Sequence, residues 1–257
     1  MARMPLPPAF LTVPLAHRGY HDAARRRPEN SLSAFGAAIA AGYGIELDVQ
    51  LTADGQAMVF HDDTLGRMTA STGAILAHTA AELGTIRLQN SDDLIPTLPQ
   101  VLALVAGKVP LLIEIKEQLD TMQDTSGRLE RAVATALDGY QGPVAVMSFN
   151  PHCIAHMARL APMIARGITT EDYDPQHCAP IPDTVCDDLR AILDYDRTES
   201  SFISHKASDL GRARVAELKS QGAAILCWTI RLPEAEAKAR QIADNITFEG
   251  YAATVGA

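Results

Sequence analysis

The sequence predicts an α/β fold, a (β/α)8 TIM barrel with a small insertion after the second strand. Short apolar runs alternate with amphipathic stretches along almost the whole chain, which is the pattern of βα units around a parallel sheet. Eight candidate strands with seven intervening helices in 257 residues match the size of such a barrel. An open doubly wound sheet is the alternative, but the glycine-rich dinucleotide fingerprint that often accompanies it is missing.

The expected strands are short runs rich in apolar and β-branched residues. In the run Ile45–Leu51, apolar residues alternate with Glu46, Asp48 and Gln50, so the apolar side chains share one face of the strand. In chain order, the expected strands are Val13–Ala16, Ile45–Leu51, Leu111–Lys116, Val144–Ser148, Met163–Gly167, Phe202–His205, Ala223–Ile230 and Asn245–Phe248.

Amphipathic stretches between these runs predict the helices. The first, Ser31–Ala41, follows Asn30, which is a residue type that caps helix N-termini. The other expected helices are Leu98–Ala106, Ser126–Leu137, Pro151–Leu160, Asp187–Asp194, Asp209–Gln221 and Pro233–Ala243.

A hairpin is expected directly after the second strand, because Asp54-Gly55 is a strong signal for a two-residue turn. If Ala53 and Gln56 pair across this turn, residue 61 lies opposite residue 48. His61 would then face the same side of the hairpin as Asp48.

An insertion follows this hairpin. Residues 62–97 are rich in Thr, Ser, Asp and Gly, with a short helical piece near Thr79–Leu83. We expect them to wall one side of a site, within a single TIM-barrel domain over residues 1–257.

Composition and charge exclude several classes of partner. The net charge is −9 and no long basic run occurs, which argues against binding to nucleic acid or to anionic lipid. The N-terminus lacks the apolar core of a signal peptide, and no stretch approaches the roughly 20 apolar residues of a membrane span. We expect a cytoplasmic protein without stable membrane association. Its cysteines, Cys153, Cys178, Cys186 and Cys227, are expected to be reduced thiols.

Carboxylates at strand-like spacing predict a metal site. Glu46 and Asp48 are two residues apart, so they share one face of a strand. Like charges held this close repel each other unless a proton neutralises one or a cation bridges them. Glu114 ends the third expected strand and would reach the same mouth of the barrel. A set of oxygen ligands selects a hard cation, Mg²⁺ or Ca²⁺, over zinc.

Basic side chains and histidines stand beside these carboxylates. Arg18 and Lys116 would add two positive charges next to the metal, which makes a site for an anion such as phosphate. His17 and His61 can change charge near neutral pH, so they are candidates for general acid–base catalysis. Together these groups predict cleavage of a phosphodiester.

The same residues carry a family resemblance, because their motifs occur in the right order over the first 116 residues. The chain resembles the glycerophosphodiester phosphodiesterase family through His17-Arg18-Gly19, Pro28-Glu29-Asn30, Glu46-Leu47-Asp48-Val49, Thr52-Ala53-Asp54-Gly55, His61-Asp62-Asp63 and Glu114-Ile115-Lys116. The second half is similar more loosely, through Ser148-Phe149 and Trp228. The resemblance implies a (β/α)8 barrel with an insertion after the second strand.

The resemblance also implies roles for single residues. His17 and His61 would be the acid–base pair, and the divalent metal, Mg²⁺ or Ca²⁺, would bind to Glu46, Asp48 and Glu114. On the substrate side, Arg18 and Lys116 would contact phosphate and Glu29 would support the residues of the first strand. Trp228 is either a core residue or a substrate-facing wall.

The implied activity is metal-dependent hydrolysis of glycerophosphodiesters to glycerol 3-phosphate and an alcohol, by way of a cyclic phosphate. The small-molecule diester would be the partner, and neither the alcohol nor the oligomeric state is predicted. Two alternatives stay open: a lysophospholipase D or sphingomyelinase D-like enzyme acting on lipids, and a non-catalytic barrel that binds phosphorylated ligands. The chain departs from the family near its last strand, where Glu249 would stand in for the usual acidic residue.

Overall fold

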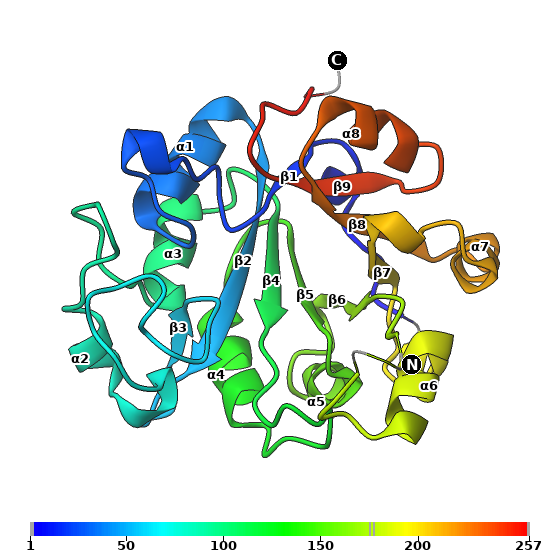
Figure 1. The fold of residues 1–257 in the computed structure, drawn as a ribbon, viewed down its shortest axis with the longest axis horizontal. Helices are drawn as coiled ribbons and strands as arrows, with labels where there is room; N and C mark the ends of the chain where they lie inside the picture. Colours follow the sequence, from blue (N-terminus) through cyan, green and yellow to red (C-terminus); the bar gives the residue numbers. More distant parts are fainter. Residues whose placement is uncertain (1–2, 175, 177, 256–257) are drawn as a thin grey trace.

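The chain folds into a closed barrel of eight parallel strands. A computed structural model describes residues 3–174, 176 and 178–255, and in Figure 1 the first strand, in blue, lies beside the last, in red, where the ring closes. Neighbouring strands pair in the order in which they are named here, and the last pairs with the first. They are β1 (Leu15–Ala16), β2 (Gly44–Leu51), β4 (Leu111–Ile115), β5 (Val144–Ser148), β6 (Ala165–Thr170), β7 (Phe202–Lys206), β8 (Ala224–Ile230) and β9 (Asn245–Phe248). The predicted (β/α)8 fold is confirmed.

Helices connect the strands around the outside of the ring. They are α1 (Leu32–Ala41), α3 (Leu98–Val105), α4 (Arg128–Leu137), α5 (Pro151–Leu160), α6 (Asp183–Ala191), α7 (Ala213–Ser220) and α8 (Pro233–Ala239). Short 3-10 turns occur at Pro8–Leu11, Ala23–Arg25, Ile75–Ala77, Leu193–Tyr195 and Ala207–Asp209. Among the described residues, no helix is long and apolar enough to cross a membrane.

The barrel has two apolar clusters, one outside the ring of strands and one inside it. The outward residues of β2, such as Leu47 and Val49, pack in the cluster beneath the helices. The inside is filled from the N-terminal end of the barrel by a second cluster that includes Phe10, Leu112 and Phe202. Further along the same inner face of β4 comes Glu114, so the interior changes from apolar to acidic toward the C-terminal mouth, where barrels of this type build their sites.

Residues 62–97 lie between the extra strand β3 (Ala57–Val59) and α3. They contain the short helix α2 (Ala80–Leu83), and Figure 1 shows this cyan segment beside β3, away from the closed ring. The segment has a small apolar cluster of its own, around Phe60, Leu65 and Ile75.

The predicted hairpin register is wrong by one residue. β3 pairs antiparallel with β2 outside the ring, with Leu51 opposite Ala57 and Val49 opposite Val59. The connection is longer than two residues, because the backbone N–H of Thr52 bonds to the Gln56 carbonyl. Residue 60, rather than residue 61, therefore lies opposite Asp48, and His61 follows the strand instead of facing Asp48 from within it.

Several predicted boundaries also shift. The fifth ring strand begins at Ala165 instead of Met163, which stays 74% exposed because the chain turns between Ala161 and Ile164. α6 starts four residues earlier than predicted, and the left-handed backbone of Ile192 ends it. The predicted helix Asp209–Gln221 is shorter in the structure, where a 3-10 turn ends at Asp209 and α7 spans Ala213–Ser220.

The cysteine prediction is wrong for one pair. Cys178 and Cys186 form a disulfide with their Cα atoms 6.5 Å apart, because the segment after β6 folds back onto the start of α6. Cys153 and Cys227 are free and buried.

Close packing inside the barrel yields a stability prediction at Gly167. A Cβ added there would lie 2.5 Å from the ring of Phe202 and 2.6 Å from its carbonyl oxygen. We expect Gly167→Ala to lower the free energy of unfolding by about 1–3 kcal/mol. Gly36→Ala in α1 meets no atom within 4 Å, so this control should raise it by about 0.5–1 kcal/mol. Urea unfolding of both variants measures the two effects, and equal stabilities would contradict the packing.

Candidate active site

Three carboxylates meet at the mouth of the barrel because of strand register. Asp48 on β2 is the direct partner of Glu114 on β4, and Glu46 lies two residues before Asp48 on the same face. Each offers an oxygen within 4.8 Å of the others', and all three residues are buried. The sequence prediction that these carboxylates converge is confirmed in its geometry.

Neighbouring groups hold each carboxylate in place. The backbone N–H of Arg18, in a left-handed conformation with φ 55°, donates to Glu46 at 2.9 Å. The side-chain amide of Asn30 donates to Asp48 at 2.9 Å. Lys116 Nζ lies 2.8 Å from Glu114 and 3.5 Å from Asp48. The orientation of the three acids is therefore set by contacts outside β2 and β4.

Asn30 corrects an assignment made from sequence. The cap of α1 is Ser31, whose hydroxyl accepts from the Ala34 N–H, and not Asn30. Because Ser31 caps the helix, Asn30 is available to bind Asp48 with both ends of its amide: its side-chain oxygen also accepts from the Asp48 N–H, at 3.3 Å.

Burial and neighbouring charges shift the pKa values of Glu46 and Asp48 in opposite directions. Loss of solvent, together with the charges of Asp48 and Glu114, raises the pKa of Glu46 well above its ordinary value. Burial opposes ionisation of Asp48 as well, but Lys116, the histidines and Arg18 overcome it and hold the pKa of Asp48 well below its ordinary range. Asp48 is ionised at neutral pH, and Glu46 is the acid that needs a further positive charge.

The donor set fits a hard divalent cation. Its members are carboxylate oxygens, which Mg²⁺ and Ca²⁺ prefer, and a bound cation would offset the burial and the neighbouring negative charges that raise the pKa of Glu46. A buried acidic trio of this kind can bind a divalent metal through Glu46, Asp48 and Glu114.

His17 is held by a residue from the far end of the chain. It follows β1, and its Nδ1 lies 2.5 Å from Oε2 of Glu249, just after β9. Arg231 donates to the other oxygen of Glu249 at 2.6 Å. The bond to His17 keeps the pKa of Glu249 low. Nε2 of His17 is left directed toward Glu46, 4.0 Å away.

His61 is held by its own neighbour in sequence. Its Nδ1 lies 2.7 Å from Asp62, and its Nε2 lies 3.3 Å from Lys116 Nζ. Arg67, from the insertion, binds Asp62 with Nε at 2.6 Å and Glu29 with Nη2 at 2.6 Å. None of the described residues that line the active-site cavity comes from residues 62–97, so the expectation that the insertion walls the site is wrong; the insertion contributes through Arg67, which holds Asp62 and Glu29.

Glu29 connects this network to Arg18. Its Oε1 accepts from Arg18 Nη1 at 2.9 Å. Despite partial burial, bonds to Arg67 and the charge of Arg18 lower the pKa of Glu29. Glu29 thus supports Arg18 and does not line the cavity itself.

The remaining predicted site residues line one cavity of about 210 Å³. They are His17, Arg18, Glu46, Asp48, His61, Glu114, Lys116 and Trp228. Trp228 packs edge-on against Phe149 with ring centroids 5.4 Å apart, and it contributes to the cavity wall. Two buried groups there, Arg18 Nε and Thr247 Oγ1, make no hydrogen bond within the described chain, although Arg18 Nε also lies 3.4 Å from Oδ2 of Asp48 as an ion pair.

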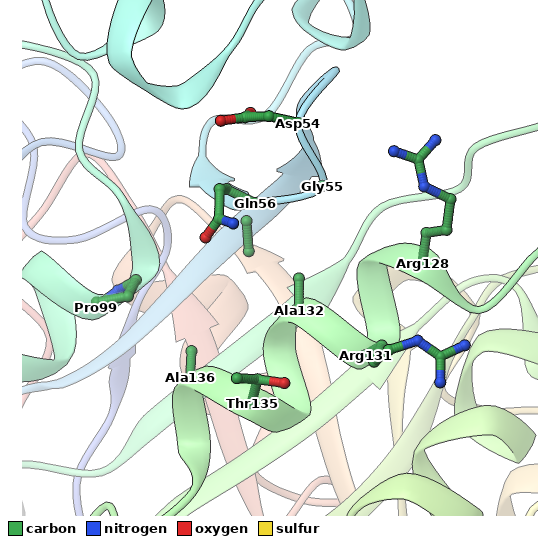
Figure 2. Close-up of a pocket in the computed structure, with 10 residues that line it drawn as sticks. Asp54, Gly55, Gln56, Pro99, Arg128, Arg131, Ala132, Thr135 and Ala136 are labelled. Carbon is green, nitrogen blue, oxygen red and sulfur yellow. The ribbon is translucent and has the colours of Figure 1, made fainter.

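A larger cavity of about 660 Å³ lies elsewhere, between the β2–β3 turn and α4. Figure 2 shows Asp54 and Gln56 on the turn, with Arg128 and Arg131 extending from α4. No histidine is among the described residues that line it. Size alone does not identify the site; the convergence of acids, bases and histidines does.

Sequence reasoning missed Arg67 and the contact between His17 and Glu249. Asp62 and Asn30 stood inside quoted motifs, but spacing did not show what they bind. A local signal existed for Asp62, which is adjacent to His61. The sequence carried no such signal for Arg67 or for the bond between Glu249 and His17, because each joins segments that only the fold brings together.

The chain is similar to known proteins over a region that contains the three carboxylates, His17 and His61. The glycerophosphoryl diester phosphodiesterase family model matches residues 17–246. A glycerophosphodiester phosphodiesterase of Caldanaerobacter subterraneus subsp. tengcongensis is 32% identical over 178 residues, 65% of this chain and 71% of that protein.

Solved structures share the fold. A putative glycerophosphoryl diester phosphodiesterase from Silicibacter pomeroyi superposes with a TM-score of 0.76 at 22% identity, covering 94% of this chain and 93% of that one. An Oleispira antarctica phosphodiesterase in complex with the product sn-glycerol-3-phosphate superposes with a TM-score of 0.73 at 24% identity, covering 94% of both chains.

The excess negative charge predicts the behaviour of Glu46→Gln. A group whose pKa is higher in the folded state than in the unfolded state contributes stability at low pH. This contribution is complete below the unfolded-state pKa and is lost as the pH rises through the folded-state pKa. Removing that carboxylate should therefore stabilise the metal-free protein at neutral pH, and the gain should vanish at about pH 4.

The same variant should weaken Mg²⁺ or Ca²⁺ binding by about 100-fold or more, since it removes a ligand. Isothermal titration calorimetry measures this, and wild-type affinity should rise with pH as Glu46 ionises. Glu130→Gln, which replaces a buried carboxylate in α4, is the control and should bind normally. Normal binding by Glu46→Gln would refute the ligand set.

Proposed function

The chain belongs to the glycerophosphoryl diester phosphodiesterase family, and from that premise we propose how it works as a glycerophosphodiester phosphodiesterase. It hydrolyses a small glycerophosphodiester to glycerol 3-phosphate and an alcohol, in a metal-dependent reaction with His17 and His61 as the acid–base pair. The observation that carries this proposal is that Nδ1 of each histidine is held by a carboxylate, while Nε2 of His17 lies 4.0 Å from Glu46 and Nε2 of His61 lies 3.3 Å from Lys116 Nζ.

The carboxylates select one tautomer of each imidazole. Glu249 accepts a hydrogen bond from Nδ1–H of His17, and Asp62 accepts one from Nδ1–H of His61. In the neutral imidazole, Nε2 therefore carries the lone pair and can take a proton from substrate. A carboxylate partner also stabilises the imidazolium that results. Each histidine is therefore equipped to serve as base in one step and as acid in the other.

Arg18 and Lys116 bind the phosphoryl oxygens. Arg18 Nε is a buried donor that makes no hydrogen bond among the described residues and is ion-paired with Asp48 at 3.4 Å, and Lys116 Nζ lies between His61 and Glu114. Their charges offset the negative charge that develops at phosphorus. A divalent metal held by Glu46, Asp48 and Glu114 would supply further stabilisation of that charge.

The reaction then follows in two steps. One imidazole takes the proton of the glycerol hydroxyl next to the phosphate, and that oxygen bonds to phosphorus. The bond from phosphorus to the leaving alcohol breaks, and the other imidazole protonates the departing oxygen. Water opens the resulting cyclic phosphate with the proton roles exchanged, giving glycerol 3-phosphate. The neighbouring hydroxyl is already positioned, which removes much of the entropic barrier.

Cavity size and lining favour a small substrate over a lysolipid. The cavity measures about 210 Å³ and most of its lining residues are charged or polar. Most of the larger apolar side chains of the insertion, including Leu65 and Ile75, are buried in their own cluster, and the exposed Leu76 and Leu94 do not line the cavity. Preference for lysophosphatidylcholine over glycerophosphocholine would reverse this choice.

Substitution of either histidine tests the acid–base assignment. We expect His17→Ala and His61→Ala each to lower glycerol 3-phosphate release by about 10²- to 10⁴-fold, and chelation of divalent metal to abolish it. A coupled assay for glycerol 3-phosphate with glycerophosphocholine as substrate gives the rates, and His78→Ala in the insertion is the control. Full turnover by His17→Ala would refute the mechanism, and unchanged activity in EDTA would refute the metal.

Glu249→Gln tests whether Glu249 positions His17. The change should lower kcat by at least about tenfold with little effect on KM, because it disturbs the tautomer and orientation of the imidazole but leaves phosphate binding intact. Glu234→Gln on the exposed face of α8 is the matched control. A loss confined to KM would assign Glu249 to substrate binding instead.

A further inference from the structure

The carboxylates that orient the two histidines are held unequally. Arg67 binds both oxygens of Asp62, Oδ2 from Nε at 2.6 Å and Oδ1 from Nη2 at 2.9 Å. Arg231 makes a single hydrogen bond to Glu249, from Nε to Oε1 at 2.6 Å. A guanidinium that binds both oxygens fixes the plane of a carboxylate, whereas one bond leaves the other oxygen free to move. Oε2 of Glu249, which accepts from His17, therefore depends on contacts other than Arg231.

His21 lies beside that oxygen. Its Nε2 is 3.8 Å from Oε2 of Glu249, the same atom that Nδ1 of His17 approaches at 2.5 Å. Nε2 of His21 is buried and makes no hydrogen bond within the described chain. Contacts with His17 and His21 keep the pKa of Glu249 low, so this carboxylate is ionised. Its charge favours the form of His21 with a proton on Nε2, because a lone pair there would face a negative oxygen.

Closure of the barrel brings His21 to this place. β1 and β9 pair with Ala16 opposite Phe248, so the residues that follow the two strands meet at the mouth. The loop after β1 turns at Gly19, whose φ is 81°, and the N–H of His21 bonds to the Gly19 carbonyl at 2.9 Å. One short loop therefore carries both His17 and His21 to the carboxylate after β9.

Exposure to water separates the two contacts that support Glu249 besides His17. The side chain of Arg231 is 63% exposed, whereas those of His21 and Glu249 are 26% and 19% exposed. Charges in water attract each other weakly, and the attraction grows as water is excluded. Water therefore weakens the contact from Arg231 more than the contact from His21, which is also the one directed at Oε2.

His21 does not reach the substrate itself. It is absent from the described residues that line the active-site cavity. Instead, it lines a separate cavity of about 440 Å³, together with Arg27 and Tyr251. Any effect of His21 on the reaction must therefore pass through Glu249 to His17.

We propose that His21 is a positioning residue for the acid–base reaction. It holds Oε2 of Glu249 in place, so that Nδ1–H of His17 stays bonded to this oxygen and Nε2 of His17 faces the cavity. The inference rests on the proposed function. It gives the His17 side of the site the second support that Arg67 alone provides on the His61 side.

Two substitutions separate the hydrogen-bond donor of His21 from its bulk. Glutamine can place its amide nitrogen near the position of Nε2, whereas leucine fills similar space without a donor. We expect His21→Leu to lower kcat for glycerophosphocholine by about fivefold with KM unchanged, and His21→Gln to keep at least about half of the wild-type kcat. His78→Leu in the insertion is the matched control and should keep wild-type kcat. Equal losses in the leucine and glutamine variants of His21, or a loss confined to KM, would overturn the proposal.

A double-mutant cycle tests the route through Glu249. In the Glu249→Gln background, adding His21→Leu should not lower kcat further, because no carboxylate remains to be held. Losses that multiply in the double variant would show that His21 acts independently of Glu249, and the proposal would be wrong.

Magnetic resonance of isotope-labelled histidine separates this inference from the function on which it rests. The imidazole signals of His17, assigned by their loss in His17→Ala, report which ring nitrogen carries the proton. We expect His21→Leu to move part of the His17 population from the Nδ1–H to the Nε2–H form, and His21→Gln to leave it unchanged. That result without turnover of any diester by the wild type would keep the role of His21 and sink the proposed function. Turnover by the wild type, with kcat and the His17 signals unchanged in His21→Leu, would overturn the role of His21 and leave the function standing.

Discussion

Repulsion among Glu46, Asp48 and Glu114 is the constraint on which the rest of the site depends. Register between β2 and β4 places the three carboxylates together in a buried setting, where their mutual repulsion is weakly screened. Asn30, the Arg18 amide and Lys116 hold them in position. These contacts fix the geometry, and burial together with the charges of Asp48 and Glu114 still raises the pKa of Glu46. The fold thus holds three buried carboxylates in an arrangement that a bound cation would stabilise.

The histidines share one arrangement that arises in two different ways. His61 obtains its carboxylate from the next residue, whereas His17 obtains it from Glu249, 232 residues away. Closure of the barrel between β1 and β9 is what brings the second pair together. The insertion completes the first pair, since Arg67 binds Asp62 and Glu29 at once. Ring closure and the insertion therefore serve the chemistry as well as the fold.

Charge is divided across the mouth of the barrel. Arg18, Lys116 and the acidic trio lie together on one side, while a neighbouring cavity is lined by other carboxylates, of which Glu171 and Asp172 bind Lys206. Phe149 lies at the boundary, packed against Trp228.

The barrel, the shared face of Glu46 and Asp48, and the position of Glu114 and Lys116 at the same mouth could all be predicted from the sequence. Each of these follows from strand periodicity and from parallel strands ending at one edge, which are local rules. Tertiary structure decided the hairpin register, the helix cap at Ser31, the Cys178–Cys186 disulfide and the partners of His17 and Arg67. Those features depend on the length of a turn or on side chains from distant segments meeting in space, and no spacing along the chain encodes them.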